Sequence, residues 1–110
     1  MITATENYFS THDGLRLFYR DYPAINKKST QDAHAGVVLC LHGLTRNSRD
    51  FEELAAHLQS HYRVLTPDMR GRGRSEYDKH WQNYHPGTYV LDVFALLREL
   101  QIERVAIIGT

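Results

Sequence analysis

The sequence predicts an α/β fold in which an antiparallel hairpin leads into a mostly parallel sheet with helices on both faces. Two continuous runs of β-branched and aliphatic residues, VVLCL and VAII, are typical of strands that a parallel sheet buries on both faces. Segments with helical apolar spacing stand between the later strands. The predicted order is therefore β-β-β-α-β-α-β, and a helix in each crossover is what right-handed connections in an open sheet require.

The first part of the chain predicts a hairpin followed by a buried strand. NYFS and LRLFYRDY flank THDG, in which Asp13-Gly14 is a good signal for a tight turn. The polar stretch PAINKKSTQDAHAG is expected to be a surface loop, and GVVLCLHG the next strand. The single cysteine, Cys40, cannot form an internal disulfide, so we expect it to be a small buried group.

Two amphipathic helices follow. Ser48 is expected to cap the first, which has Asp50, Glu52 and Glu53 in its opening turn. Its predicted apolar face consists of Phe51, Leu54, Ala55 and Leu58. YRVLTPD is the next strand, and a second helix is expected over residues 88–100. The apolar face of this second helix is predicted to consist of Val90, Val93, Phe94, Leu97 and Leu100. ERVAIIG is the last predicted strand.

Composition narrows the classes of function. A chain of 110 residues with 42% apolar and 24% charged residues fits one globular domain. Thirteen basic residues balance thirteen acidic ones, so neither nucleic acid nor an anionic membrane is the expected partner. No targeting or membrane-spanning segment is visible in this sequence, and we expect a cytoplasmic protein. His57 and His61 have the spacing of zinc ligands, but Leu58 replaces the glutamate of H-E-x-x-H, so no metal is expected.

Two strand ends carry distinctive residues, and ligands of open α/β sheets gather at such ends. His42-Gly43-Leu44-Thr45 follows one strand, and the glycine allows a sharp turn with outward amide groups. Residues 67–75, PDMRGRGRS, follow the next. Their G-x-G lacks the third glycine of a dinucleotide site, since an acidic residue stands in its place. Asp68 and Arg70 are expected to brace this loop, and its three alternating arginines are interpreted mainly as solvated charge.

These motifs give the chain its resemblance to a known family. VVLCLHGLTRNSRDFEELAAHL, the D-x-R-G-x-G-x-S stretch from Asp68 to Ser75, and VAIIGT occur here in the order and spacing of the α/β-hydrolase superfamily. The resemblance runs from about Tyr8 to Thr110, so residues 1–110 are interpreted as the N-terminal portion of a single α/β-hydrolase domain. In the family the last of these strands leads into the nucleophile elbow G-x-S-x-G. Gly109 and Thr110 would be its first two positions.

The resemblance implies a cofactor-free hydrolase of small ester-like or related acyl substrates. A serine nucleophile, the triad acid and the triad histidine would follow Thr110 in that order, so the 110-residue chain alone is predicted to be inactive. The backbone N–H of Leu44 would donate to the developing oxyanion, and His42 and Gly43 would shape the turn that carries it. His42 is not assigned as the triad base. Trp81 and Tyr84 are expected to line an acyl pocket.

Several alternatives remain open at this stage. The same scaffold carries C–C bond hydrolases, lactonases, peptidases and haloperoxidases, as well as epoxide hydrolases and haloalkane dehalogenases, which use an aspartate nucleophile. HGLT lacks the proline frequent after His-Gly-x in those last two groups, which favours serine. A non-catalytic homologue that acts as a binding module would share these 110 residues. We expect either a truncated hydrolase or one whose chain is interrupted at a modified nucleophile, and the sequence assigns neither a substrate nor an oligomeric state.

Overall fold

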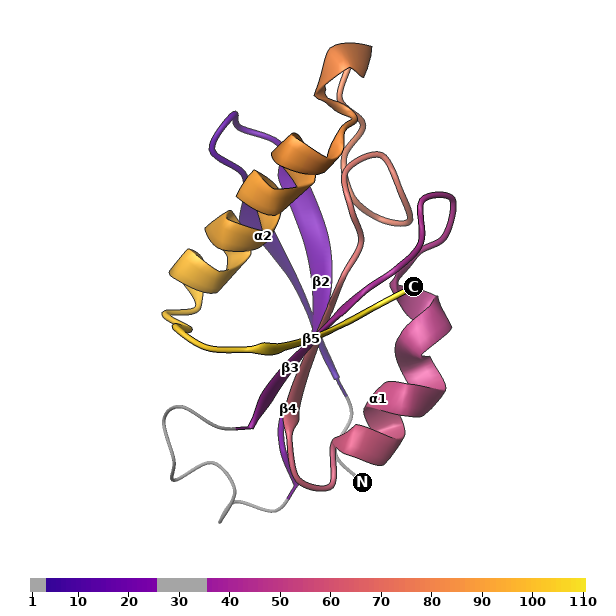
Figure 1. Cartoon of the computed structure of the whole chain (residues 1–110), viewed down its shortest axis with the longest axis vertical. Coiled ribbons are helices and arrows are strands. Elements are labelled where there is room, and N and C mark those ends of the chain that lie inside the picture. Colours follow the sequence, from indigo (N-terminus) through magenta and orange to yellow (C-terminus); the bar gives the residue numbers. More distant parts are fainter. Residues whose placement is uncertain (1–3, 26–35) are drawn as a thin grey trace.

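The computed structural model describes residues 4–25 and 36–110 and contains five strands and two α-helices in the predicted order (Figure 1). The elements are β1 (Thr5–Ser10), β2 (Arg16–Tyr22), β3 (Val37–Leu41), the 3-10 turn η2 (Ser48–Phe51), α1 (Glu52–Leu58), β4 (Arg63–Pro67), the 3-10 turn η3 (Trp81–Asn83), α2 (Pro86–Glu99) and β5 (Ala106–Gly109). Most of the surface loop predicted before β3 lies outside the described residues.

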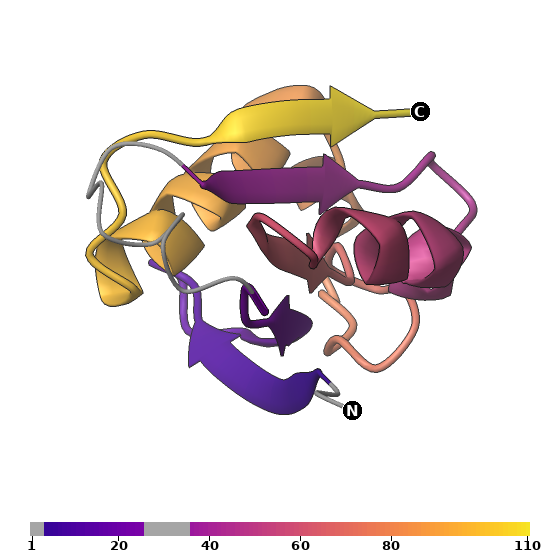
Figure 2. The same ribbon diagram turned by 90° about the horizontal axis from the view of Figure 1, so that it is seen from below.

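The strands form one sheet in the order β1-β2-β4-β3-β5 (Figure 2). The hairpin strands β1 and β2 are antiparallel, and β2 also pairs antiparallel with β4. β3 lies between β4 and β5 and is parallel to both. The predicted antiparallel hairpin and parallel sheet are thus confirmed, and the carboxyl ends of β4, β3 and β5 meet at one edge.

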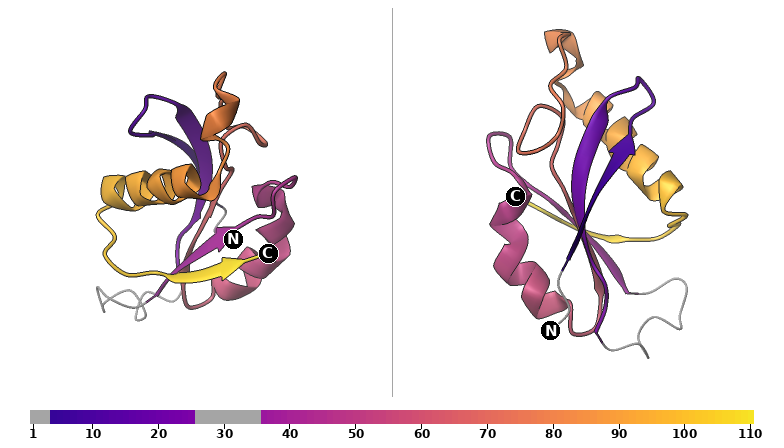
Figure 3. Two further views of the ribbon diagram at one scale, coloured as in Figure 1. Left: turned by 45° about the horizontal axis from the view of Figure 1, so that its top comes forward. Right: turned by 180° about the vertical axis from the view of Figure 1, so that it is seen from behind.

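Each face of the sheet has its own apolar core, because alternate residues of a strand point to opposite sides. Leu39 and Leu65 pack with Leu96 of α2 on one face. On the other face, Val38, Cys40 and Val64 belong to a cluster that includes Phe51 and Ala55 from η2 and α1. The helices therefore cover opposite faces of the sheet, as Figure 3 shows. Cys40 is fully buried, as predicted, and burial raises the pKa of its thiol.

The predicted start of the first helix needs a correction. The segment begins as the 3-10 turn η2, and its cap is Asn47, whose Oδ1 accepts from the Arg49 N–H at 2.9 Å. Ser48 is instead buried, and its Oγ accepts from Arg20 Nη1 at 2.6 Å. Asn and Ser are comparable N-caps, so the local sequence did not separate these neighbours. Leu54, predicted to face the core, is exposed.

The second helix begins earlier than predicted and presents a different inner face. Pro86 is its first residue, and the ring of His85 caps it by accepting from the Gly87 N–H. Thr88, Asp92 and Leu96 are its buried residues, whereas Val90 and Phe94 are exposed. The predicted apolar stripe is split because one flank packs on the sheet and the other lines an open groove of about 740 Å³ against β5.

Within residues 4–25 and 36–110, no helix combines the length and the apolar character needed to cross a membrane.

Candidate active site

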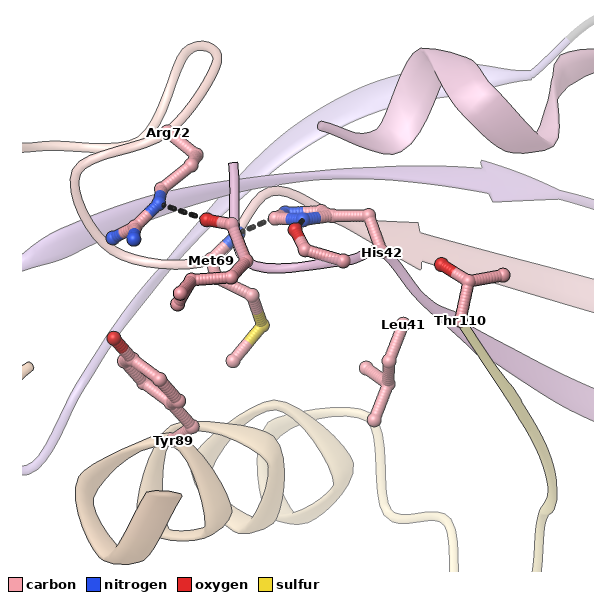
Figure 4. A pocket seen from close by; sticks show the side chains of 8 residues that line it. Leu41, His42, Met69, Arg72, Tyr89 and Thr110 are labelled. Atoms are coloured by element: carbon pink, nitrogen blue, oxygen red, sulfur yellow. Dashed lines mark hydrogen bonds between the residues drawn. The ribbon is translucent and has the colours of Figure 1, made fainter. Parts of the chain in front are cut away.

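A pocket of about 240 Å³ opens where the parallel strands end (Figure 4). Its lining comes from the end of β3 and the turn after it, the loop after β4, the start of α2 and the end of β5; these residues are Leu41, His42, Gly43, Leu44, Met69, Arg72, Tyr89 and Thr110. Most of the predicted catalytic residues therefore share one pocket, although Gly109 is not among its lining residues.

His42 ties the turn after β3 to the loop after β4. Its Nε2 accepts from the Met69 N–H at 2.9 Å, and its Nδ1 lies 2.8 Å from the Gly43 carbonyl oxygen (Figure 4). Because Nε2 accepts, the proton belongs on Nδ1, which donates to the carbonyl. The imidazole is 8% exposed and has no nitrogen left for a substrate. Its geometry fits the structural role predicted for it.

The turn carrying Leu44 lies beside the end of β5. The Thr110 N–H donates to the Leu41 carbonyl at 3.3 Å. A Cβ added to Gly43 would come within 3.7 Å of the Thr110 carbonyl oxygen, so the two strand ends are neighbours. The Leu44 N–H has no hydrogen-bond acceptor among the described residues. An amide without an internal partner is the type of donor that an oxyanion requires.

The loop after β4 is organised by the buried carboxylate of Asp68. Its Oδ1 accepts from the Ser48 N–H at 2.7 Å, and its Oδ2 accepts from the Arg74 N–H at 2.9 Å. Gly73 has a φ of +52°, and a Cβ there would collide with this carboxylate. Ser75 closes the loop, because its Oγ donates to the Asp68 carbonyl and accepts from the Phe18 N–H. The brace predicted for Asp68 is confirmed.

Arg70 is enclosed by three carboxylates and is fully buried, contrary to the expectation of solvated charge. Its Nε and Nη2 donate to the two oxygens of Asp92 in α2, at 2.8 and 2.6 Å. Nη1 and Nη2 also donate to Asp13 in the hairpin turn, and Nη1 to Asp78 at 2.8 Å. All five donors of the guanidinium are used. Arg70 thus joins the hairpin, the loop and α2, which confirms its predicted bracing role.

Three carboxylates surround the single positive charge of Arg70, and other donors also stabilise two of them, Asp13 and Asp78. Hydrogen bonding to Arg70 holds the pKa of Asp13 far below its usual range, with help from the Thr11 hydroxyl. The pKa of Asp78 is lowered by the His80 N–H, the Asn83 side-chain amide and Arg70, in that order. Hydrogen bonds to the charged form favour ionisation, so Asp13 and Asp78 stay charged at neutral pH.

Arg72 points to the pocket from the same loop. Its Nε donates to the Leu44 carbonyl at 2.8 Å, and its Nη1 donates to the Arg70 carbonyl at 3.0 Å. Its guanidinium carbon lies 5.5 Å from the centre of the Tyr84 ring. Within the described residues Arg72 forms no ion pair, in contrast with Arg70 and Arg74. Charge spacing in the sequence did not reveal this difference.

The predicted acyl-pocket residues lie elsewhere. Trp81 is 77% exposed in η3 and is absent from the pocket lining. The Tyr84 hydroxyl accepts from the Asp78 N–H at 2.6 Å, so this side chain supports the loop. Their contact with substrate stays a prediction. Met69 and Tyr89, which sequence reasoning did not select, line the pocket instead. Tyr89 stands directly before Val90, the first residue of the predicted apolar stripe, and no local pattern distinguishes it.

Two groups of side chains could be considered as metal ligands. His57 lies in α1 and His61 follows it, and both are exposed. In the described part of the chain, His12, Asp13 and Asp92 lie close enough together to hold an ion. Both carboxylates already accept from Arg70, and Asp92 is buried, so these three side chains make a poor cation site.

Known proteins resemble this chain along most of its length. Residues 36–110 match the family model of the α/β hydrolase fold. A 3-hydroxybutyrate-oligomer hydrolase of Cupriavidus necator is 44% identical over 71% of this chain and 27% of its own length. A crystal structure of an α/β hydrolase from Novosphingobium aromaticivorans superposes with a TM-score of 0.87 and 45% identity, over 100% of this chain and 36% of that one.

More distant structures share the fold. An epoxide hydrolase from Vigna radiata superposes with a TM-score of 0.80 at 22% identity, over 96% of this chain and 30% of that one. The present chain therefore spans about a quarter to a third of the length of these proteins.

Proposed function

Because the chain belongs to the α/β hydrolase fold family, we propose that it supplies the oxyanion side of a hydrolase acting on small ester-like substrates. The observation that carries the proposal is the juxtaposition of the Leu44 turn with Thr110. These are the places where the family puts its oxyanion donor and the start of its nucleophile elbow. In this chain they border one pocket.

The proposed reaction is acyl transfer to a serine that follows Thr110, and then to water. As the serine oxygen attacks the ester carbonyl, negative charge develops on the carbonyl oxygen. The unpartnered Leu44 N–H would donate to that oxygen. The bond from His42 to the Met69 N–H would keep the turn in place without a proton transfer by His42. A fixed donor of this kind contributes about 10²–10³ in turnover.

The similarity to the 3-hydroxybutyrate-oligomer hydrolase supports an ester as the substrate, because units of a hydroxy acid are joined through ester bonds. The small volume of the pocket, about 240 Å³, supports a short group beside the scissile carbonyl. The absence of proline after His42-Gly43-Leu44 supports serine over aspartate as the nucleophile.

The test is hydrolysis of ethyl acetate and ethyl butyrate by the native, full-length protein, together with labelling by a fluorophosphonate. We expect ester turnover, loss of turnover on labelling, and a label on the residue after Thr110. Opening of styrene oxide without fluorophosphonate labelling would instead assign an aspartate nucleophile. Absence of both activities in the folded native protein would favour a non-catalytic binding module and overturn the proposal.

A further inference from the structure

Resting on the proposed hydrolase function, we propose that Arg72 and Tyr89 form a carboxylate-binding subsite, so that preferred substrates are short esters bearing a free carboxylate. Both side chains line the pocket that contains the Leu44 turn. They come from different elements, the loop after β4 and the first turns of α2, and Figure 4 shows the Tyr89 ring directed toward that loop.

The positive charge of Arg72 has no carboxylate partner among the described residues. Three arginines alternate in the loop: Arg70 contacts three carboxylates, and Arg74 pairs with Glu6 at 2.9 Å. Arg72 contacts two backbone carbonyls and no carboxylate within the described residues. It is also half-buried. A partly buried cation in a pocket without a countercharge favours a ligand that brings one.

The guanidinium of Arg72 is held in one orientation by its hydrogen bonds. Nε and one Nη1 hydrogen are bonded to the Leu44 and Arg70 carbonyls, and Nη2 has no acceptor among the described residues. Both Nη2 hydrogens and one Nη1 hydrogen therefore remain. Two neighbouring N–H groups of a planar guanidinium match the two oxygens of a carboxylate, and little freedom is lost on binding because Nε and Nη1 are already held.

The Tyr89 hydroxyl is a second polar group available to a ligand in this pocket. Its oxygen is buried and has no hydrogen-bond partner, an uncommon state for a polar group in a folded protein. A carboxylate seated at Arg72 would accept from it. One guanidinium and one hydroxyl suit a singly charged group, whereas a phosphate would leave further oxygens unpaired beside Leu41 and Met69.

The connection to Leu44 sets the distance scale of the substrate. Arg72 Nε is bonded to the carbonyl of the residue whose N–H is the proposed oxyanion donor. The carboxylate and the scissile carbonyl must therefore lie a few bonds apart. Half-esters of short dicarboxylic acids meet this requirement.

The experiment compares monoethyl succinate with ethyl levulinate, a neutral ester of nearly the same shape, by ethanol release from the native protein. We expect the ratio of kcat/KM values to favour the charged ester and to fall by about tenfold to hundredfold in Arg72→Gln, the range for a hydrogen bond to a charged group. Arg74→Gln is the matched control, since it removes a charge two residues away that pairs with Glu6, and it should keep the ratio. Tyr89→Phe should lower the ratio by a smaller factor.

The outcomes separate binding from support of the turn. If Arg72→Gln slows both esters equally, Arg72 only positions Leu44 and the subsite is disproved. A wild-type protein without preference for the charged ester also overturns it. If neither ester is cleaved, the hydrolase proposal fails, and calorimetric binding of monoethyl succinate, weakened in Arg72→Gln and unchanged in Arg74→Gln, decides the subsite separately.

Discussion

Arg70 and Arg72 lie two positions apart in the loop after β4, and their guanidinium groups have opposite surroundings. Arg70 is buried against Asp13, Asp78 and Asp92 and joins three segments of the fold. Arg72 is bonded to carbonyl oxygens at the edge of a pocket. Two arginines of the same loop therefore have different roles: the first holds segments of the fold together, and the second, as we propose, recognises a ligand.

The loop backbone produces this difference. Gly71 and Gly73 both have positive φ values, +76° and +52°, so the chain reverses direction around Arg72. The Asp68 carboxylate then fixes the loop through the N–H of Arg74. The side chains of residues 70 and 72 consequently leave the loop toward different neighbours.

The largest expected effect comes from removing the internal charge. Arg70→Met leaves buried carboxylates without their partner, and breaking a buried ion pair in this way costs about 3–5 kcal/mol. We expect the free energy of unfolding, measured by urea denaturation, to fall by this amount. Arg74→Met removes an exposed pair and should cost at most about 1 kcal/mol. Similar losses in the two variants would contradict the assignment of Arg70 as a structural centre.

Gly73→Ala tests whether the path of the loop separates the two arginines. Its Cβ would collide with the Asp68 carboxylate, and the backbone is left-handed, so we expect a loss of about 3 kcal/mol from overpacking and strain. Gly14→Ala is the control, because φ there is +90° but no atom lies within 4 Å of the added Cβ. Its loss should be about 1 kcal/mol, from strain alone. Equal melting curves for the two variants would show that Asp68 does not constrain the loop.

The pH dependence of folding stability in Asp13→Asn tests the contribution of this carboxylate to the Arg70 cluster. The pKa of Asp13 is lowered in the folded state, so its stabilising contribution is complete above the unfolded pKa of about 4 and disappears as pH falls through the lower folded value. We expect wild type to be more stable than Asp13→Asn by about 1–2 kcal/mol at neutral pH. The difference should shrink steadily below about pH 4. A stability difference that grew toward acid pH would contradict the lowered pKa of Asp13 in the folded state.

Apart from the control variants, Arg72→Gln should have the smallest effect on folding. It removes two bonds to carbonyls at a partly exposed site, which we expect to lower the free energy of unfolding by about 1 kcal/mol. Urea denaturation beside Arg70→Met provides the measurement. A loss of stability as large as that of Arg70→Met would show that Arg72 also has a mainly structural role.

The strands and the order of elements could be predicted because parallel strands and amphipathic helices have strong periodic patterns. The turn at His42-Gly43 and the bracing of Asp68 also followed from motifs. The cap of η2 was placed one residue late, because Asn47 and Ser48 are both good caps and Ser48 is held by Arg20 across the fold. The buried side of α2 was mistaken because Asp92, which breaks the apolar pattern, faces inward to meet Arg70.

The pocket itself was only partly predictable. Leu44 and Thr110 belong to recognisable motifs, but Tyr89 reaches the pocket through the angle at which α2 crosses the sheet. Trp81 and Tyr84 looked suitable because they are aromatic residues in a long loop, yet one is exposed and the other supports Asp78. Tertiary placement of this kind leaves no local signature in the sequence.

The strand order has a consequence for synthesis on the ribosome. β2 pairs with β4, which begins about forty residues later in the chain, and β3 also needs β4 as its neighbour. At translation rates of roughly 5–20 residues per second, the finished hairpin waits some seconds with one edge unpaired. Only when β4 emerges do the earlier strands join into one sheet. Slow codons just before β4 would therefore prolong the interval in which a nascent hairpin is open to pairing with another chain.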